Sequence, residues 1–301
     1  MDPPPSTHER RSLPRRLMPV VLRQAGLLQA ADWLHYLWVR IRNASANRAF
    51  LRQHPGFRTP PPHLAYDAHG SVDWHVYLDS GEKVAQKIGR LLVAHLDRLV
   101  SAYLEWGCGP GGVIRHIPKM LGENVKVFGT DYNAETIAWC RETFQGITFV
   151  HNDIAPPLTF ASSTFDCVSG LSVLSHLSEE MCSAWLAELA RVTKAEGLVI
   201  LTTKGDSQEY RLLPAERELL KSGRGVFRGK VREGKRMYDS ILPKRYFESI
   251  LPPSLDVVSY GANAMPEYWQ DLWVLKKKPA SDLTSTMESE SNHSSANSTS
   301  G

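Results

Sequence analysis

The feature that most constrains the fold is a regular alternation of strand-like and helix-like segments across the middle of the chain. Short, mostly apolar runs predict five strands, at 99–106, 124–131, 147–153, 165–174 and 197–204. A helical pattern precedes the first strand, at 82–98. Others lie between strands, from the glycine cluster to about residue 120, at 133–144 and at 178–193. Segments of these lengths are typical of parallel strands covered on both faces. The pattern therefore predicts an α/β fold with a doubly wound, mostly parallel sheet, and Ser178 as the N-cap of the last of these helices.

Two further strand-like segments, 255–261 and 268–278, follow near the C-terminus with no helical pattern between them. They predict an antiparallel pair at the sheet edge, which completes a seven-stranded sheet. The segment 205–250 interrupts the alternation, and we expect it to form a cap over the strand ends. We therefore expect four parts along the chain. Residues 1–16 form a disordered tail and residues 17–82 form a helical and aromatic lid. Residues 83–279 form the main domain, and residues 280–301 form a disordered Ser/Thr-rich tail.

A helix is expected over 20–51, ahead of the main domain. Its apolar residues recur at steps of three and four, at Leu27, Ala31, Leu34, Trp38 and Ile41. This stripe predicts a helix that packs on the core. A basic helix with two tryptophans, Trp33 and Trp38, is also compatible with contact to a membrane surface. The aromatic and proline-rich segment 54–81 is too long for a simple connection, and it predicts a lid or an entrance.

Composition excludes several classes of protein. The 35 Lys and Arg against 32 Asp and Glu leave a small excess, which does not indicate a nucleic-acid partner. The four cysteines lie far apart without a Cys-x-x-Cys pair, so neither a disulfide framework nor a metal site is expected. No apolar run reaches the roughly 18 residues of a membrane span, and no secretory signal is recognisable. We therefore expect a cytoplasmic protein that uses no metal.

The stretch LEWGCGPGGVIRHI, residues 104–117, places four glycines within six positions. It follows the first predicted strand of the sheet, and ligands in such folds bind beyond the carboxyl ends of the strands. Bare backbone there lets a planar or charged ligand approach the main chain closely. The spacing satisfies both the dinucleotide fingerprint and the shorter glycine motif of S-adenosylmethionine sites, so the glycines alone do not choose between these cofactors.

Three acidic residues at successive strand ends favour S-adenosylmethionine. Glu105 stands two positions before Gly107, where a carboxylate repels a pyrophosphate and suits a ligand that carries an ammonium and a sulfonium. Asp131 lies 24 positions after Gly107, the right distance to accept from two ribose hydroxyls, although NAD sites share that acid. Asp153 follows the third strand and is placed to accept from an adenine amino group.

The stretches LEWGCGPGG, FGTDYN, HNDI, FDCVSGLSVLSHLSEE and AEGLVILTTKG resemble the successive motifs of class I S-adenosylmethionine-dependent methyltransferases, over residues 100–205. The resemblance implies the Rossmann-like, seven-stranded sheet of that family and S-adenosyl-L-methionine as cofactor. It implies that Gly107 and Gly109 line the methionine part, that Asp131 holds the ribose and that Asp153 reads the adenine. Further cofactor contacts are expected at neighbouring motif positions, namely Cys108, Gly111, Tyr132, Asn152, Ile154 and Leu171.

A narrower likeness links NRAFLRQHPGF, WGCGPGGVIRH and YWQDLWVLKKK to bacterial methyltransferases of polysaccharide and secondary-metabolite pathways, to which these stretches are similar. Relatives often carry an arginine after the last loop glycines, where Gly112 stands here. The resemblance therefore assigns no role to Arg115. Trp106 and Trp139 are expected to be packing residues.

We predict methyl transfer to a small-molecule or glycan acceptor, with oxygen as the methylated atom. His176, just past the fourth strand, is the candidate base, against the alternative that it only packs beside the cofactor. His75 and Tyr77 are secondary candidates for contact. The segment 204–245 holds 12 Lys or Arg against 6 Asp or Glu, which suits an anionic acceptor or a hairpin with charged, solvated edges. An NAD(P)-dependent oxidoreductase and a non-catalytic binding protein of the same fold stay open as alternatives.

Overall fold

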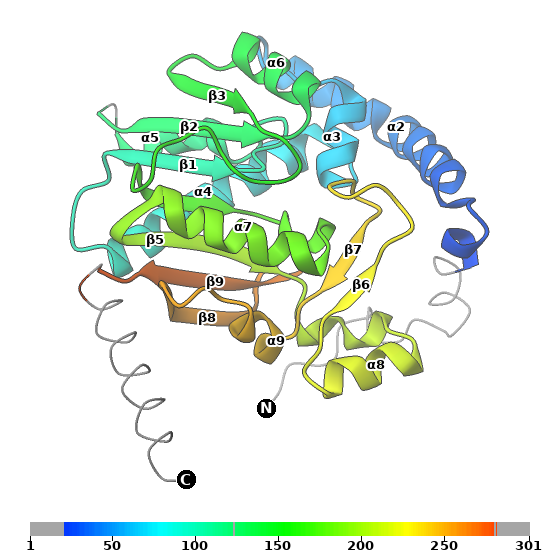
Figure 1. The fold of residues 1–301 in the computed structure, drawn as a ribbon. Coiled ribbons are helices and arrows are strands. Elements are labelled where there is room, and N and C mark those ends of the chain that lie inside the picture. The colour runs from blue at the N-terminus through cyan, green and yellow to red at the C-terminus, as the bar shows by residue number, and fades with distance from the viewer. Residues whose placement is uncertain (1–20, 123, 280, 282–301) are drawn as a thin grey trace, which may run out of the picture.

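The computed structural model describes residues 21–122, 124–279 and 281, and its centre is one seven-stranded sheet (Figure 1). The strand order is β3 (Ile147–His151), β2 (Lys126–Asp131), β1 (Ala102–Trp106), β4 (Phe165–Gly170), β5 (Thr193–Thr203), β9 (Gln270–Lys277) and β8 (Leu255–Met265). β1 to β5 run parallel, whereas β9 is antiparallel to both of its neighbours. The predicted doubly wound sheet with a C-terminal antiparallel pair is confirmed.

Alternate residues of the central strands point into two separate hydrophobic cores. In β5, Val199 and Leu201 belong to one core, and Leu198 and Ile200 belong to the other. β4 and β9 divide their side chains in the same way. Burial on both faces explains why these strands form nearly continuous apolar runs in the sequence.

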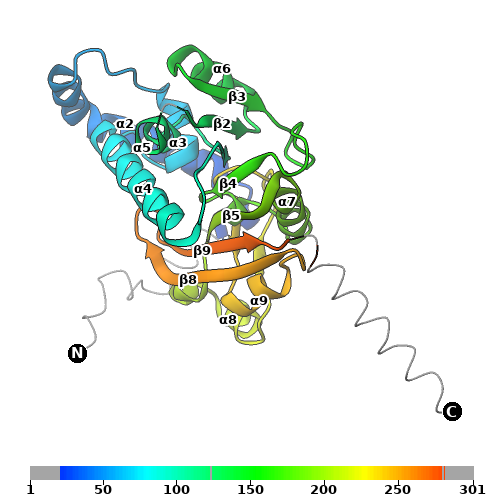
Figure 2. The ribbon, with the colours of Figure 1, turned by 90° about the vertical axis from the view of Figure 1, so that its left-hand side faces the viewer.

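Helices cover both faces of the sheet, as the predicted alternation requires. One core includes side chains of α4 (Trp74–His95), α5 (Ile117–Leu121) and α6 (Ala134–Thr143). The other core includes side chains of α7 (Glu179–Val192) and α9 (Lys244–Ser249). Figure 2 shows α4 and α7 on opposite sides of the sheet.

Element boundaries follow from capping and from turns. Ser178 caps α7 as predicted, because its Oγ accepts from the Met181 N–H at 3.3 Å. The helix expected directly after the glycines is shorter than predicted, since a 3₁₀ turn, η1 (Ile114–His116), precedes α5. The fourth strand ends at residue 170 rather than 174, and a second 3₁₀ turn, η2 (Leu174–His176), follows it.

The lid contains more helix than its sequence suggests. The helix predicted over 20–51 is interrupted at Gly26, whose φ is 70°, so that α2 runs over Leu28–Gln53. The segment 54–81, expected as a lid or an entrance, contains α3 (Pro62–His69) and the start of α4. α4 begins at residue 74 rather than 82 because Asp73 caps it, accepting from the Val76 N–H at 3.1 Å. The division proposed between 82 and 83 therefore falls inside a helix.

The apolar stripe of α2 does not pack on the core, and that prediction is wrong. Leu34, Trp38 and Ile41 are 61%, 52% and 77% exposed. α2 instead packs through its other side, where Val39 and Phe50 are buried against aromatic residues of α3 and α4. Helical periodicity thus identified the helix but not the face that the protein covers.

The cap occupies the chain between β5 and β8. Its elements are η3 (Asp206–Arg211), α8 (Pro214–Lys221), the antiparallel pair β6 (Val226–Arg228) and β7 (Asp239–Ile241), and α9. Figure 1 shows β6, β7 and α3 at the end of the sheet toward which β1 and β2 point. Lid and cap therefore meet at the edge where a ligand of this fold binds. The predicted tails, 1–16 and 280–301, lie outside the described residues apart from residue 281.

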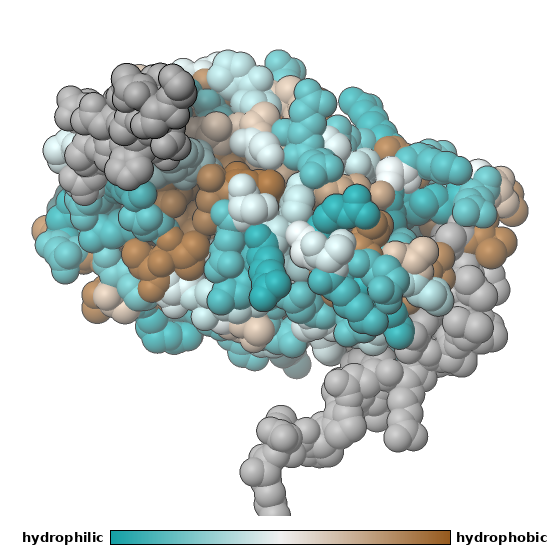
Figure 3. Space-filling view, turned by 60° about the horizontal axis from the view of Figure 1, so that its bottom comes forward, coloured by the Kyte–Doolittle hydropathy of each residue, from teal (hydrophilic) through white to brown (hydrophobic). Residues whose placement is uncertain are grey.

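The face shown in Figure 3 is mostly hydrophilic, with apolar residues in smaller groups between polar ones. None of the helices within the described residues is long and apolar enough to cross a membrane. The four cysteines, Cys108, Cys140, Cys167 and Cys182, are free and buried.

Candidate active site

A cavity at the carboxyl ends of β1, β2 and β4 gathers most of the residues predicted to contact a cofactor. We call it the first cavity, and the predicted residues in its wall are Glu105, Gly107, Cys108, Gly109, Asp131, Tyr132, Asn152, Asp153, Ile154, Leu171 and His176. Gly111 is not part of that wall, because its backbone, with φ of 79°, faces Phe144. Gly112 lines the cavity in its place.

The glycine loop leaves no room for side chains. Gly107 has φ of 71°, and a Cβ on it would lie 2.4 Å from Val173 Cγ2. Gly109 has φ of 50°, a conformation that favours glycine. The loop is anchored to the next strand because the Cys108 N–H donates to the Thr130 carbonyl at 2.8 Å. The backbone of the loop is therefore fixed in place and bare toward the cavity.

Asp131, at the end of β2, joins the glycine loop to the start of α6. Its carboxylate accepts from the Gly109 N–H at 3.0 Å and from the Asn133 N–H at 2.8 Å. Burial raises the pKa of Asp131 to about 6, and the two backbone donors act in the opposite direction. Each oxygen keeps a second lone pair, so the carboxylate retains the capacity to accept from ribose hydroxyls.

Glu105 is the most strongly perturbed acid of the site. Its side chain is 3% exposed, and Oε2 has no hydrogen-bond partner among the described residues. Burial raises the pKa of Glu105 well above its usual range. A buried carboxylate without a partner is costly unless a ligand satisfies it. Its position in the first cavity fits a cationic group of a bound ligand.

Asn152 and Asp153 follow β3, as predicted. The Asn152 Nδ2 donates to the Asp153 carbonyl at 2.7 Å, while its buried Oδ1 has no partner within the described chain. Asp153 is exposed at the rim. These two residues offer acceptor oxygens at the edge of the first cavity beside β3. In the strand order, β3 is separated from β4 by β2 and β1.

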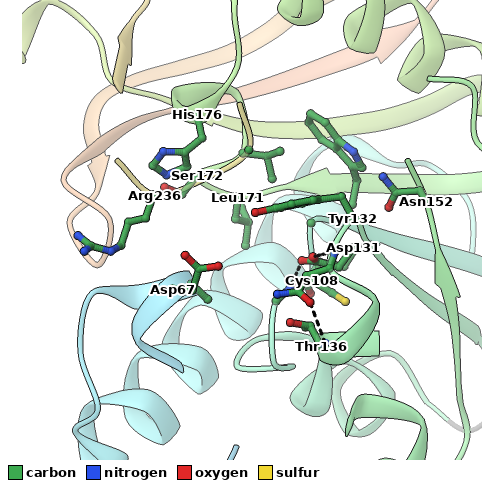
Figure 4. A pocket seen from close by; sticks show the side chains of 18 of the residues that line it. Asp67, Cys108, Asp131, Tyr132, Thr136, Asn152, Leu171, Ser172, His176 and Arg236 are labelled. Carbon is green, nitrogen blue, oxygen red and sulfur yellow. Dashed lines mark hydrogen bonds between the residues drawn. The ribbon is translucent and has the colours of Figure 1, made fainter. Parts of the chain in front are cut away.

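His176 lies at the other end of the first cavity. Figure 4 shows it near Ser172 and Arg236, apart from Tyr132 and Asn152. Its Nδ1 donates to the Tyr238 carbonyl at 2.8 Å, which leaves the lone pair on Nε2. Burial lowers the pKa of His176 to about 4, so the ring is neutral near pH 7.

A second cavity, of about 610 Å³, adjoins the first. The two cavities share six wall residues, Ala68, His69, Ser172, His176, Arg236 and Tyr268. Desolvation of the His69 imidazole by the surrounding protein lowers its pKa to about 4 as well. Because the cavities share this wall, a ligand in the second cavity would lie next to a ligand in the first.

Lid and cap residues that the sequence does not single out close the first cavity. Lys235 of the β6–β7 loop pairs with Asp67 of α3 at 2.8 Å. The next residue, Arg236, pairs with Asp32 of α2. The Gly234 N–H donates to the His176 carbonyl at 2.9 Å. These contacts join segments far apart in the sequence, and no local motif signals them.

The remaining sequence candidates have structural roles. The Tyr77 hydroxyl donates to the Pro110 carbonyl at 2.6 Å, so Tyr77 supports the glycine loop from behind. His75 is exposed on α4, and it is outside both of the cavities described above. The Arg115 guanidinium lies over the Phe57 ring at 4.4 Å. Trp106 and Trp139 pack on other aromatic rings, as expected. The described residues contain no group of His, Cys, Asp or Glu that would hold a metal.

Residues 104–197 match the family model of a methyltransferase domain. None of the curated proteins matches this chain significantly. A solved structure of the PH0226 protein from Pyrococcus horikoshii is similar at 17% identity over 71% of this chain and 95% of its own, with a TM-score of 0.49. The magnesium protoporphyrin IX methyltransferase of Synechocystis, solved with bound S-adenosylhomocysteine, is similar at 16% identity over 80% of this chain and 99% of its own, also with a TM-score of 0.49. A methyltransferase of Methanosarcina mazei shares 16% identity over 62% of this chain and 96% of its own, with a TM-score of 0.47.

The family match over residues 104–197, the strand order and the chemistry of the first cavity agree with one another. They are consistent with a methyltransferase domain of the class I type, which implies S-adenosyl-L-methionine as the cofactor. The unsatisfied oxygens of Glu105 and Asn152, together with the bare glycine backbone, fit that cofactor. The matched residues run from β1 into β5 and include the whole predicted cofactor set.

Proposed function

We propose that the protein transfers the methyl group of S-adenosylmethionine to an oxygen of a small-molecule or glycan acceptor held in the second cavity. The observation that carries this proposal is the wall that the two cavities share, in which His176 presents a neutral imidazole with its lone pair on Nε2. We propose that a hydroxyl of an acceptor in the second cavity approaches this nitrogen, because His176 lines both cavities.

The cofactor roles follow from the chemistry of each residue. We propose that Glu105 accepts from the ammonium of the methionine part, since its buried carboxylate has an unsatisfied oxygen among the described residues. Gly107 and Gly109 supply bare backbone beside that part. Asp131 accepts from the ribose hydroxyls, and Asn152 and Asp153 bind the adenine edge. Tyr132, Cys108, Ile154 and Leu171 line the space between these polar contacts.

Methyl transfer requires little covalent chemistry from the protein. When bound, S-adenosylmethionine supplies an electrophilic methyl on a sulfonium, and the S–CH₃ bond breaks with its electron pair going to sulfur as the new O–CH₃ bond forms. His176 Nε2 takes the proton of the acceptor hydroxyl. The pairs Lys235–Asp67 and Arg236–Asp32 hold lid and cap together over the site, which positions the acceptor and excludes water.

A turnover assay with matched histidine variants tests this proposal. The purified protein is incubated with S-adenosylmethionine and fractionated metabolites of the host, and mass spectrometry searches for a product that has gained one methyl group. We expect His176→Gln to lose turnover and to retain cofactor binding. His69→Gln is the matched control, because His69 lines the same shared wall and has a similarly lowered pKa.

Loss of turnover in His69→Gln with normal turnover in His176→Gln would contradict the assignment of the base. Tight binding of S-adenosylmethionine without turnover across all fractions would favour a binding protein instead of an enzyme.

We also propose a cytoplasmic location, which the four free cysteines support.

A further inference from the structure

A cluster of cations surrounds one buried carboxylate at the wall of the second cavity. Asp239, in β7, accepts from Lys204 Nζ at 2.6 Å, from Arg228 at 3.0 Å and from Arg211 at 3.3 Å. Arg228 also pairs with Glu216 at 2.7 Å. The Lys204 and Arg228 side chains are only 15% and 12% exposed. The cluster is therefore largely shielded from bulk water.

A fourth cation reaches the cluster from the lid. The guanidinium of Arg23 donates to three carbonyls of the β6–β7 hairpin and its loop, those of Arg228, Gly229 and Met237, at 2.5, 2.8 and 2.7 Å. These carbonyls satisfy its hydrogen bonds but do not neutralise its charge. Arg23, Lys204, Arg211 and Arg228 all line the second cavity.

The charges of this cluster do not balance. Four cations face two carboxylates, Asp239 and Glu216, within the described part of the chain, which leaves an excess of two positive charges. Desolvation lowers the pKa of Lys204 and of Arg23, as it does for cations that are buried without full neutralisation. Buried charges are normally paired, so the excess indicates an anionic ligand.

Three other carboxylates lie in the wall of the second cavity, and one of them, Glu267, has a buried oxygen without a hydrogen-bond partner among the described residues. Asp32 pairs with Arg236, Asp73 caps α4, and Glu267 belongs to the turn between β8 and β9. None of these three forms an ion pair with the cationic cluster in the described structure.

We propose that Arg23, Lys204 and Arg211 bind an anionic group of the acceptor, a carboxylate or a phosphate, and that this contact orients the acceptor toward His176. The inference rests on the proposed function and narrows its acceptor to an acidic molecule. His176 and Asp239 are linked through the Tyr238 carbonyl, which accepts from His176 one residue before Asp239. An anion held by the cluster thus lies in the same cavity as the proposed base.

The test measures anion binding directly, without an acceptor. Inorganic phosphate and succinate are titrated separately into the full-length protein at constant ionic strength, and the shift in melting temperature gives an apparent Kd for each. We expect Lys204→Met and Arg211→Gln to raise that Kd about tenfold, since each removes a charged donor. Asp239→Asn should lower it, because it removes a competing carboxylate. The matched control is Lys221→Met, an exposed cation of α8 that lies outside the cavity.

The outcomes separate this inference from the proposed function. Phosphate binding with little response to succinate assigns a phosphate group, and the reverse assigns a carboxylate. Equal Kd values in wild type, Lys204→Met and Arg211→Gln, or no response to either anion, would overturn the inference. Titration of each variant with S-adenosylhomocysteine is a readout independent of anion binding. If S-adenosylhomocysteine does not bind the wild-type protein, the proposed function is wrong, whatever the anions do.

A second, independent observation concerns the outer face of α2. The exposed side chains of Leu27, Leu34, Trp38 and Ile41 recur with the helical period. Three exposed arginines, Arg42, Arg48 and Arg52, flank the same side of the helix, and the Arg42 guanidinium lies over the Trp38 ring at 5.0 Å. Asp32 is the single acidic residue of α2, and Arg236 neutralises it.

We infer that this apolar and basic face docks on a bilayer surface that carries anionic lipid headgroups. Tryptophan, leucine and isoleucine enter the interfacial region, and the arginines bind the headgroups. The charge of the face argues for this occupant, because the exposed arginines beside the apolar residues are complementary to an anionic surface.

Vesicle sedimentation tests the docking surface. The full-length protein is mixed with phosphatidylcholine vesicles with and without phosphatidylglycerol. We expect binding to the anionic vesicles alone and a loss of at least about fivefold in the double variant Trp38→Ser, Ile41→Ser. The control is Val93→Ser with Leu99→Ser, which removes two apolar residues elsewhere that are even more exposed. Equal binding by wild type and the Trp38 variant, no binding at all, or a wild-type dimer that the variant dissociates would overturn the inference.

Discussion

Replacing Glu105 by glutamine removes the ionisable carboxyl group from the first cavity with almost no change in shape. In the free protein the carboxylate is buried, with one oxygen unsatisfied among the described residues. Glu105→Gln should therefore leave the fold intact and raise its stability at neutral pH, because it relieves the desolvation that also raises the pKa of Glu105.

The expected loss of cofactor affinity follows from the contact that disappears. A hydrogen bond to a charged partner contributes about 1.5–3 kcal/mol. At about 1.4 kcal/mol for each factor of ten, Glu105→Gln should weaken S-adenosylhomocysteine binding about 10- to 150-fold. 5′-Methylthioadenosine lacks the ammonium, so its affinity should change little. The difference between the affinity losses for the two ligands therefore measures the contribution of the contact to the ammonium.

The pH dependence supplies a second signature. Burial holds the pKa of Glu105 above its usual range, and the cofactor ammonium requires the ionised carboxylate. Affinity for S-adenosylhomocysteine should therefore rise with pH up to that raised pKa, with release of a proton on binding. Isothermal titration calorimetry in buffers of different ionisation enthalpy measures both effects. A parallel loss of affinity for both ligands, or proton release that persists in Glu105→Gln, would refute the reasoning.

The other predictions concern the base, the loop, the ribose site and a helix cap. With S-adenosylmethionine saturating at every pH, so that ionisation of Glu105 does not limit binding, the lowered pKa of His176, about 4, places the acidic limb of the pH–rate profile near pH 4. A limb near the ordinary histidine value of about 6.5 would argue against this base. Gly107→Ala should lower the free energy of unfolding in urea by about 1–3 kcal/mol more than Gly122→Ala, because both have positive φ but only the first meets a neighbouring side chain, at 2.4 Å. Asp131→Ala should greatly weaken cofactor binding, and near wild-type affinity in calorimetry would exclude the ribose role. Ser178→Ala should cost about 1 kcal/mol of stability by thermal unfolding, and no change would mean that the cap at 3.3 Å contributes nothing.

The grouping of the residues expected to bind the cofactor could be predicted from the sequence because they lie in strands or directly after them. Glu105 lies in β1, Asp131 ends β2 and Asn152 follows β3, so the parallel order of the strands brings them to one edge. Gly111 shows the limit of this reasoning. The loop contains it, but the side of the loop that faces the cavity depends on φ and on contact with Phe144, which no spacing encodes.

The acceptor half depends on tertiary contacts that sequence patterns do not specify. Asp67 and Lys235 are 168 positions apart, and they meet only because lid and cap pack together. The positive segment 204–245 is visible in the sequence, yet its meaning changes once Lys204 and Arg211 converge on Asp239. Periodicity in α2 likewise identifies an apolar stripe without showing that Trp38 and Ile41 face outward.

The most direct test of the account is a pair of calorimetric titrations of the wild-type protein, one with S-adenosylhomocysteine and one with NAD⁺. We expect S-adenosylhomocysteine to bind at one site per chain and NAD⁺ not to bind, because Glu105 repels a pyrophosphate beside the glycine loop. Tight binding of NAD⁺ with no binding of S-adenosylhomocysteine would contradict it.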